Sequence, residues 1–571
     1  MNFNTQTLNK MAKESITKIK CGEIEEYLVE LEFEQECSPT PYLIEWQENQ
    51  IDMYGFWSSK SHSFHNLTPN WSMREIDSKT ASGMPLACIY NKADENRACI
   101  ALSDPASPVK ISVGVVEENA KLHFKIELLS QKSPIMKGYE VVIRIDRRKI
   151  PAYKAIKETR DWWSELGYKC AYVPNESRLP MYSCWYSFHQ RTIPEEIIEE
   201  CKVAKALGMD TVIVDDGWQT DDNGRSYAYC GDWQVCEKKI PDMKAFVDEI
   251  HSLGMKFMLW FSVPFVGFES KNYKRFEGKY LNTRHRVSAS VLDPRFPDVR
   301  EFLVDTYCEN VKKYGYDGLK LDFIDSFHLS EESSEAYDQM DTVSVEEGLE
   351  KLLKEATVRL KEINREIMIE FRQSYIGPIV SRYGNLFRVT DCPNDAYFNR
   401  IGSLDLRITS DKIPVHSDML MWNKDDTNES VMYQLLAIMF SVPQISVRFD
   451  SITNDHKRML KAFLDFWRKH REIILDGEIT VWGLDANYTA AKVQKDGHNV
   501  AVLYQSGVYT LAGDEDAHLF NSTGNDFVYV ESDRERSYEI YNIFGEKYAQ
   551  GRVCAGVNKL PVKNCEMAFI A

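Results

Sequence analysis

Between residues 180 and 450 the sequence alternates eight short apolar runs with longer amphipathic stretches, and this alternation restricts the fold more than any other feature. The runs lie at residues 181–187, 211–216, 256–261, 318–323, 367–371, 386–391, 412–418 and 444–449. Several intervening stretches have Pro near the start and end in Gly, which is the usual chemistry of helix boundaries. Eight strands that each lead into a helix predict a (β/α)₈ TIM barrel.

The chain on both sides of this barrel has β patterning. From residue 23 to 147 short apolar runs are separated by clusters of Pro, Gly, Asn and Asp, a pattern typical of a β-sandwich. Helical periodicity follows at residues 152–167, and β patterning returns after residue 475. We therefore predict an N-terminal β-sandwich at residues 1–150, a linker helix at 151–180, the barrel at 181–475 and a small C-terminal β-sandwich at 476–571.

Composition argues against several classes of protein. The chain has 69 Lys and Arg against 87 Asp and Glu, a formal net charge of −18, which opposes nonspecific attraction to nucleic acid or an anionic membrane. Its 13 Cys include no C-x-x-C pair, which argues against a disulfide framework and a structural zinc. No apolar run long enough for a secretion signal or a membrane span is present. We expect a cytoplasmic protein with reduced thiols, without a membrane or nucleic-acid partner.

No motif for a metal ion or a nucleotide is visible. His189, His285, His328 and His416 lie near predicted loops, but none has a second His at the spacing of a metal site. No glycine-rich phosphate-binding motif occurs. We therefore predict neither a metal nor a cofactor.

Carboxylates gather where the predicted barrel strands end. Asp215 and Asp216 end the second run, and Asp322, Asp391 and Asp418 end the fourth, sixth and seventh. Active sites of such barrels lie at the C-terminal ends of the strands, so these side chains are expected at one mouth. At a single strand end, a turn-forming or helix-capping Asp is the common reading. Five at one mouth repel one another unless cationic partners or a function justify them.

Lys320 and Asp322 stand two residues apart on one predicted strand. Both side chains project into the barrel if Leu319 and Leu321 face the helices. The ammonium is expected to keep the carboxylate ionised, which suits nucleophilic attack on an anomeric carbon, while a second, protonated carboxyl assists the leaving oxygen. A purely structural Lys–Asp pair is the alternative.

The motifs around these residues resemble family 36 glycoside hydrolases. DDGWQ at residues 215–219, GDW at 231–233, LW at 259–260, VLDP at 291–294 and KLDF at 320–323 occur in the order and spacing of that family. Its members are retaining α-galactosidases, and relatives include raffinose-type galactosyltransferases. The resemblance covers the barrel, and the predicted order of sandwich, barrel and β domain matches the family layout.

The resemblance implies a role for each matching residue. Asp322 corresponds to the catalytic nucleophile, and Lys320 to a Lys that contacts the sugar. Asp215 and Asp216 correspond to a pair whose carboxylates bind galactose hydroxyls, and Trp260 to the Trp of the LW motif.

The general acid/base has two candidates. Asp391 follows Thr390 as the family's acid/base follows a Ser or Thr, and Asp395 is the second candidate. Three further aromatic residues near the same strand ends, Trp185, Trp218 and Trp233, are expected to bind substrate, because aromatic rings stack on the C–H faces of sugars. Core packing is their alternative role.

Two stretches depart from the family pattern. No carboxylate follows LW in WFSVPFVG, and IEFRQSYIGP replaces a Cys–Ser–Gly-rich loop at the end of strand five. Glu370, Arg372 and Gln373 then occupy that wall and read a 2-substituent, another sugar or a longer aglycone; an Arg–Glu pair that supports the barrel rim is the alternative. Arg286, shortly before VLDP, is expected to supply the family's cationic contact.

Together these observations predict a retaining α-glycosidase, most simply an α-galactosidase that hydrolyses terminal α-galactosyl residues of small oligosaccharides. Two alternatives within the family are an α-galactosyl transglycosylase and an α-N-acetylgalactosaminidase. An alternative from another class is a catalytically silent sugar-binding protein on the same scaffold. The expected partner is a small oligosaccharide, and the sequence leaves a homo-oligomer open.

Overall fold

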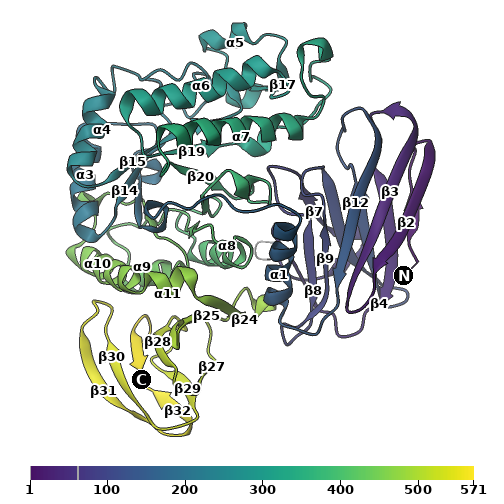
Figure 1. The fold of residues 1–571 in the computed structure, drawn as a ribbon. Helices are drawn as coiled ribbons and strands as arrows, with labels where there is room; N and C mark the ends of the chain where they lie inside the picture. Colours follow the sequence, from purple (N-terminus) through teal and green to yellow (C-terminus); the bar gives the residue numbers. More distant parts are fainter. Residues whose placement is uncertain (1, 61–63) are drawn as a thin grey trace.

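The computed structural model describes residues 2–60 and 64–571, and its centre is a ring of eight parallel strands (Figure 1). The strands are β13 (Met181–Ser183), β14 (Thr211–Val214), β15 (Lys256–Ser262), β19 (Gly318–Asp322), β20 (Met368–Arg372), β21 (Leu386–Arg388), β22 (Val415–His416) and β23 (Gln444–Ile445). Neighbours in the ring follow the chain order, and isolated bridges His416↔Val442 and Leu420↔Ile445 join its last two members. The predicted barrel is confirmed, with one strand in each predicted run.

Helices surround this ring. They are α3 (Pro194–Leu207), α4 (Met243–Ser252), α6 (Pro297–Tyr314), α7 (Val345–Ile363), α8 (Ala396–Thr409), α9 (Asn428–Ala437) and α10 (Asn454–Lys469), with shorter helices α2 (Trp185–Phe188), α5 (Lys271–Arg275) and α11 (Arg471–Asp476). Both α3 and α6 begin with Pro and end at a Gly in the left-handed conformation, Gly208 and Gly315. Ser344 and Thr453 cap α7 and α10 through their side chains.

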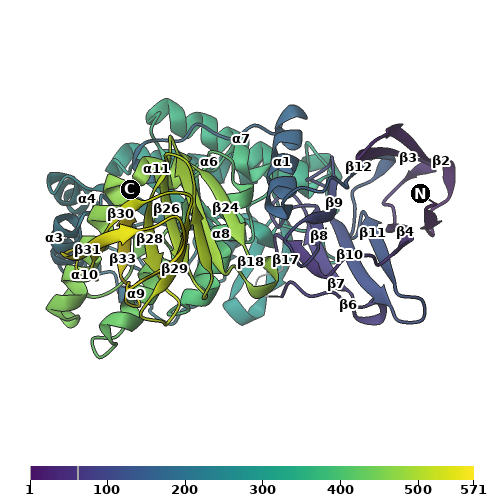
Figure 2. The same ribbon diagram turned by 90° about the horizontal axis from the view of Figure 1, so that it is seen from below.

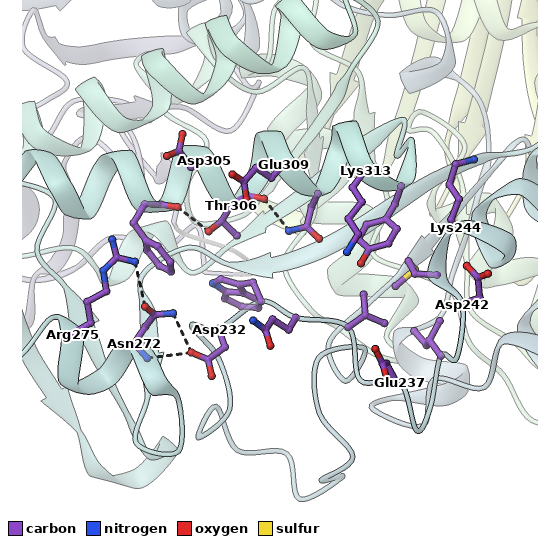
Figure 3. Close-up of a pocket in the computed structure, with 18 of the residues that line it drawn as sticks. Asp232, Glu237, Asp242, Lys244, Asn272, Arg275, Asp305, Thr306, Glu309 and Lys313 are labelled. Carbon is purple, nitrogen blue, oxygen red and sulfur yellow. Dashed lines mark hydrogen bonds between the residues drawn. The ribbon is translucent and has the colours of Figure 1, made fainter.

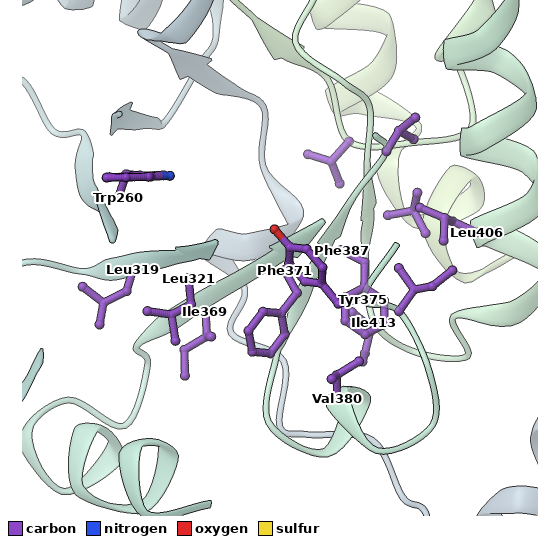
Figure 4. Close-up of a cluster of buried hydrophobic side chains, with 14 of the residues drawn as sticks. Trp260, Leu319, Leu321, Ile369, Phe371, Tyr375, Val380, Phe387, Leu406 and Ile413 are labelled. Atoms are coloured by element: carbon purple, nitrogen blue, oxygen red, sulfur yellow. The ribbon is translucent and has the colours of Figure 1, made fainter. Parts of the chain in front are cut away.

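Along each strand, side chains point alternately into the barrel and toward the surrounding helices. Five inward side chains, Met181, Ile213, Met258, Met368 and Leu386, form an apolar layer of their own. Leu319 and Leu321 point the other way, into the core shared with the helices, where Figure 4 shows them beside Ile369. Lys320 and Asp322 therefore face the interior, as predicted from the strand period.

Two six-stranded sheets form the N-terminal part. One contains β1 (Asn4–Gln6), β4 (Tyr42–Asn49), β11 (Lys121–Leu128), β10 (Val109–Val116), β6 (Thr68–Pro69) and β7 (Arg74–Ser78). The other contains β2 (Met11–Lys20), β3 (Ile24–Cys37), β12 (Met136–Asp146), β9 (Asn96–Leu102), β8 (Leu86–Tyr90) and β5 (Gly55–Ser58). Their inward residues form a separate apolar core, so this part is the predicted sandwich. Helix α1 (Ala152–Glu165) lies between it and the barrel (Figure 1).

The C-terminal part is also β-rich. A seven-stranded sheet contains β24 (Glu478–Trp482), β25 (Ala490–Lys495), β26 (His498–Leu503), β28 (Asp516–Asn521), β33 (Met567–Ile570), β30 (Arg536–Tyr541) and β31 (Lys547–Val553). A three-stranded sheet contains β27 (Val508–Leu511), β29 (Val528–Ser532) and β32 (Gly556–Leu560). The C-terminal part lies beneath the barrel in Figure 1 and in front of it in the view from below in Figure 2. A further small sheet, β16 (Phe265–Gly267), β18 (Ala289–Leu292) and β17 (Tyr280–Arg284), follows β15.

One buried carboxyl joins all three parts of the chain. Oδ1 of Asp405, on α8, accepts hydrogen bonds from Trp57 Nε1 of the sandwich, at 2.8 Å, and from the Tyr488 hydroxyl of the C-terminal part. Burial raises the pKa of Asp405 to about 7.

In the part of the chain that the structure describes, no helix is both long and apolar enough to cross a membrane.

Candidate active site

The predicted nucleophile is held by four hydrogen-bond donors. Oδ1 of Asp322 accepts from Arg372 Nε at 2.9 Å, from its neighbour Phe323 N at 2.9 Å and from the Tyr375 hydroxyl. Oδ2 accepts from Trp260 Nε1 at 3.0 Å. The carboxylate is thus anchored through Oδ1, while Oδ2, with one donor, keeps a lone pair for another contact.

These contacts decide the charge of Asp322. Burial favours the neutral acid, but the cations Arg372 and Lys320 and the donors Tyr375 and Trp260 outweigh it, so the pKa of Asp322 lies well below its ordinary value. The carboxylate is ionised at neutral pH.

Lys320 acts on Asp322 from a distance, because its direct partner is another residue. Lys320 Nζ lies 2.6 Å from Asp215 Oδ2, and both side chains are buried. Lys320 nevertheless lowers the pKa of Asp322, as expected from their shared face of β19. Its own ion pair crosses from β19 to the residue after β14, and Arg372 of β20 supplies the ion pair to Asp322.

The second carboxyl of the DD pair is held differently. Asp216 accepts hydrogen bonds from the side-chain amides of Gln190 and Gln219, both at 2.7 Å, and has no cationic partner within salt-bridge distance among the described residues. Burial therefore raises the pKa of Asp216 to about 6.

Arg388 connects the carboxylates on the other side of the barrel. Its guanidinium is 1% exposed and forms ion pairs with Asp418, with Asp391 at 2.8 Å and with Glu370 at 3.4 Å. Sequence reasoning missed Arg388 and Tyr375. An Arg within the apolar run at residues 386–391 was the available signal, since a buried guanidinium requires acidic partners.

The two acid/base candidates differ in their hydrogen bonds, their exposure and the charges near them. Asp395 caps α8 by accepting a hydrogen bond from Phe398 N at 3.0 Å. Asp391 precedes the helix, its side chain is 46% exposed, and it lies in the field of both Arg388 and Arg372. Despite partial burial, these cations lower the pKa of Asp391. Asp391 and Asp322 thus share the influence of Arg372, whereas Asp395 has a structural role.

The remaining predicted residues lie in different surroundings. Trp218 and Trp233 are buried behind Trp260: Trp218 Nε1 donates to the Trp260 carbonyl at 2.9 Å, and the Trp218 and Trp233 rings stack 6.0 Å apart. In this position both rings are core, and Trp233 also lines a cavity outside the strand ends. Trp185 is half-buried and begins α2 instead of ending a strand, with its ring 4.8 Å from His189.

Two predicted residues stand at opposite extremes of exposure. Arg286 is exposed in the turn His285–Val287, while Arg284 lies over the ring of Phe265, which in turn packs on Phe323 beside Asp322. Glu370 is buried below the mouth and accepts a hydrogen bond from Gln444 Nε2 at 2.9 Å.

A cavity of about 1070 Å³ lies outside the strand ends (Figure 3). Its wall comes from α4, α5, α6 and residues 232–244, and includes Trp233, Asn272, Arg275 and Glu309. None of the strand-end carboxylates lines it. The motif residue Asp232 is held here by Asn272 Nδ2 at 3.1 Å, which gives GDW a structural role in fixing α5.

Comparison with solved structures agrees with this architecture. An α-galactosidase AgaA variant of Geobacillus stearothermophilus in complex with raffinose superposes with a TM-score of 0.63 at 13% identity, over 100% of this chain and 89% of that one. The galactosidase domain of the α-galactosidase–sucrose kinase AgaSK gives a TM-score of 0.64 at 13% identity, over 100% and 85%. At this identity the similarity concerns the fold.

Sequence comparisons are local to the barrel motifs. The α-galactosidase Mel36A of Lactobacillus acidophilus is 42% identical over 74 residues, which is 12% of this chain and 10% of that protein. AgaA of Geobacillus stearothermophilus is 30% identical over 120 residues, 20% of this chain and 16% of that protein. The melibiase family model matches residues 181–370.

The family model covers the barrel from β13 to β20, and the likeness to family 36 structures over the whole chain concerns the fold. These comparisons agree with the resemblance inferred from the motifs, and the chain spans only 10% and 16% of the length of the two α-galactosidases that it matches in sequence. The segment matched by the melibiase model includes Asp215, Asp216, Lys320 and Asp322. The residues that anchor and surround the carboxylates from β20 and β21, including Arg372 and Arg388, follow the matched segment.

Proposed function

We propose that this protein is a family 36 retaining α-galactosidase that releases terminal α-galactosyl residues from small oligosaccharides. The observation that carries the proposal is Asp322: a carboxylate at a barrel strand end, ionised, anchored through one oxygen and able to attack through the other. AgaA, with the same fold, has been solved with raffinose and with stachyose, which supports oligosaccharides of this type as substrates.

The proposed reaction has two half-reactions. Oδ2 of Asp322 attacks the anomeric carbon while Asp391 gives its proton to the departing oxygen. Asp391 then removes a proton from water, which attacks the same carbon and restores the Asp322 carboxylate. Two displacements at one carbon leave its configuration unchanged.

Asp391 must be protonated in the first step although its pKa is lowered in the free site. Its side chain is 46% exposed, so a sugar bound against it removes water from the carboxyl. Desolvation favours the neutral acid and raises its pKa. We therefore expect substrate binding to favour the protonated form of Asp391. Arg388, whose guanidinium lies 2.8 Å from Asp391 Oδ1, holds the side chain in place.

The polar residues on the opposite side of the mouth suit sugar hydroxyls. Asp215 and Asp216 offer acceptor oxygens, and Lys320 offers donors, from neighbouring parts of the ring. We also propose a cytoplasmic location, supported by thirteen cysteines that are all free, eight of them buried.

Four variants test the assignment. Asp322→Asn is expected to abolish release of nitrophenol from nitrophenyl α-galactoside, and Asp391→Ala to lower it by at least about 100-fold. Azide should restore turnover of Asp391→Ala as an α-galactosyl azide product, since a small anion takes the place of the base-activated water in the second displacement. Asp395→Asn is the matched control: Asn caps a helix as well as Asp does, so this variant should keep both its stability and its activity. Asp395→Ala should lose about 1 kcal/mol of helix-cap stability and keep its activity.

The same assay separates the alternatives. Parallel reactions with nitrophenyl α-N-acetylgalactosaminide and α-glucoside identify the donor, and product analysis with excess sucrose distinguishes transfer from hydrolysis. Near-wild-type hydrolysis by Asp322→Asn, or cleavage of β-glycosides alone, would contradict the proposal. Absence of turnover on all donors with retained sugar binding would favour the silent sugar-binding protein.

A further inference from the structure

A hairpin of the N-terminal sandwich rests on the barrel beside Asp322. Residues 79–83, the sandwich hairpin, are closed by backbone hydrogen bonds from Lys79 N to Ser82 O at 2.9 Å and from Ser82 N to Lys79 O at 3.0 Å. Thr80 N donates to Ala106 O at 3.0 Å, which ties the hairpin to its own sheet region. Lys79 and Ser82 are polar side chains that are nonetheless buried. The sandwich hairpin is therefore a fixed part of the interface.

Its second half, Ser82 and Gly83, contacts the loop after β20, residues 373–377. Gly83 N donates to the Ser374 carbonyl at 2.7 Å, and the Ser82 and Ser374 hydroxyls lie 3.5 Å apart. The backbones approach so closely at Gly377 that a Cβ there would lie 2.7 Å from Gly83 O. Tyr375 stands between these two contact points, so the hairpin fixes the loop on both sides of the residue that bonds Asp322.

Its first residue, Lys79, contacts the loop after β19, which begins directly after Asp322. Lys79 Nζ donates to the Phe327 carbonyl at 2.7 Å. Lys79 has no carboxylate within salt-bridge distance among the residues described, and burial lowers its pKa to about 8. The two loops are also bonded to each other, because Ser374 Oγ lies 3.3 Å from Asp325 Oδ2.

We propose that the sandwich hairpin positions the nucleophile. It holds the 373–377 loop against the β19 loop, and the loop in turn keeps Tyr375, together with Arg372, on Oδ1 of Asp322. Tyr375 N donates to the Arg372 carbonyl at 3.0 Å, so the two anchors move together. The N-terminal sandwich is then part of the catalytic geometry through contact, without touching the sugar. This inference rests on the proposed role of Asp322.

Displacement of the loop has a measurable consequence for catalysis. A misplacement of the reacting group by about 1 Å lowers the rate by about 100-fold. The sugar-binding side, Asp215 and Lys320, belongs to β14 and β19 and keeps its own ion pair. A defect in positioning therefore lowers kcat and kcat/KM together and leaves KM nearly unchanged.

Gly377→Ala is the direct test, because the added methyl acts as a wedge between the loop and the hairpin. Gly348→Ala is the matched control: its Cβ would lie 2.7 Å from Pro294 O, the same clash but between α7 and the segment before α6. The three atoms nearest to this Cβ include none from the sandwich hairpin or from the 373–377 loop. Neither glycine has a positive φ, so the comparison isolates the contact. We expect Gly377→Ala to lose about 10- to 100-fold in kcat on nitrophenyl α-galactoside with KM within about threefold, and Gly348→Ala to lose stability alone.

Lys79→Met provides a second, milder test in the full-length protein. It removes the bond to Phe327 and keeps the backbone of the hairpin. Hydrogen exchange should become faster in peptides covering residues 323–327 and 373–377, whereas Lys92→Met, which breaks an exposed pair with Asp485, should not change them.

The outcomes separate this inference from the proposed function. If wild-type protein cleaves α-galactosides but Gly377→Ala matches Gly348→Ala in kcat, and Lys79→Met leaves exchange of both loops unchanged, the positioning role is wrong. If the wild type cleaves no α-galactoside, the proposed function fails, and hydrogen exchange still decides whether the hairpin holds the two loops.

Discussion

The hydroxyl of Tyr375 offers the sharpest test of how Asp322 is used. Tyr375 is fully buried, its ring packs edge-on against Phe371 at 6.1 Å, and Figure 4 shows its hydroxyl directed away from the apolar cluster. Tyr375→Phe keeps this packing and removes one of the three donors on Oδ1. The variant therefore changes the electrostatics of the nucleophile with little change in its surroundings.

The magnitude follows from the charge on the acceptor. A hydrogen bond to a charged group contributes about 1.5–3 kcal/mol, more than one to a neutral ester oxygen. The bond is strong when Asp322 is a free carboxylate and weak in the glycosyl-enzyme, so its loss disfavours departure of the carboxylate. If half of the charge has developed in the transition state, the second half-reaction slows by about 3- to 12-fold.

The assay is steady-state and rapid-mixing kinetics with an activated aryl α-galactoside. We expect kcat and KM to fall together, with a burst of nitrophenol that reports the accumulated glycosyl-enzyme. Tyr383→Phe is the control, because the Tyr383 hydroxyl bonds Glu350 at 2.8 Å instead of Asp322. An unchanged kcat in Tyr375→Phe, or a rise in KM without a burst, would refute the role of Oδ1 as the anchored oxygen.

Two further predictions concern buried charge. Arg388→Met leaves Asp418 and Glu370 buried without their guanidinium, so the free energy of unfolding should fall by about 3–5 kcal/mol, measured by urea denaturation; a loss below about 1 kcal/mol would contradict the ion-pair assignment. Asp405 has a pKa of about 7 in the folded protein against 3.8 as its ordinary value, so the folded state binds more protons between these values and its stability should fall as the pH rises from about 4 to 7. Asp405→Asn should remove this part of the pH dependence in thermal unfolding scans, and an identical slope in variant and wild type would contradict it.

Strand parity allowed the barrel and the orientation of its polar residues to be predicted. Leu319 and Leu321 on one face place Lys320 and Asp322 on the other, and this depends only on the two-residue period of a strand. The pairing of these side chains depends on the register between neighbouring strands. Lys320 is level with Glu370 of β20 and bonds Asp215, which follows β14. No pattern within the Lys320 segment indicates this partner.

Other differences have equally physical reasons. The apolar run at residues 181–187 was predicted as one strand, but β13 ends at Ser183 and a helix begins at Trp185, because short apolar runs have no decisive period. Trp218 and Trp233 carry the motif of a sugar site and lie in the core, where their partners come from β15. Tyr375 reaches Asp322 because the loop after β20 folds back on it, and the sequence contains no local signal for this long-range contact.

The junction at Asp405 has a consequence for the history of this chain. Trp57 and Tyr488, separated by more than four hundred positions in sequence, donate to the same oxygen on a barrel helix. A lineage that loses or exchanges either flanking β part must change this carboxyl as well, since a buried acid cannot easily give up its donors. The three parts are therefore expected to be inherited as one unit, and Asp405 is expected to be present wherever both flanking parts are present.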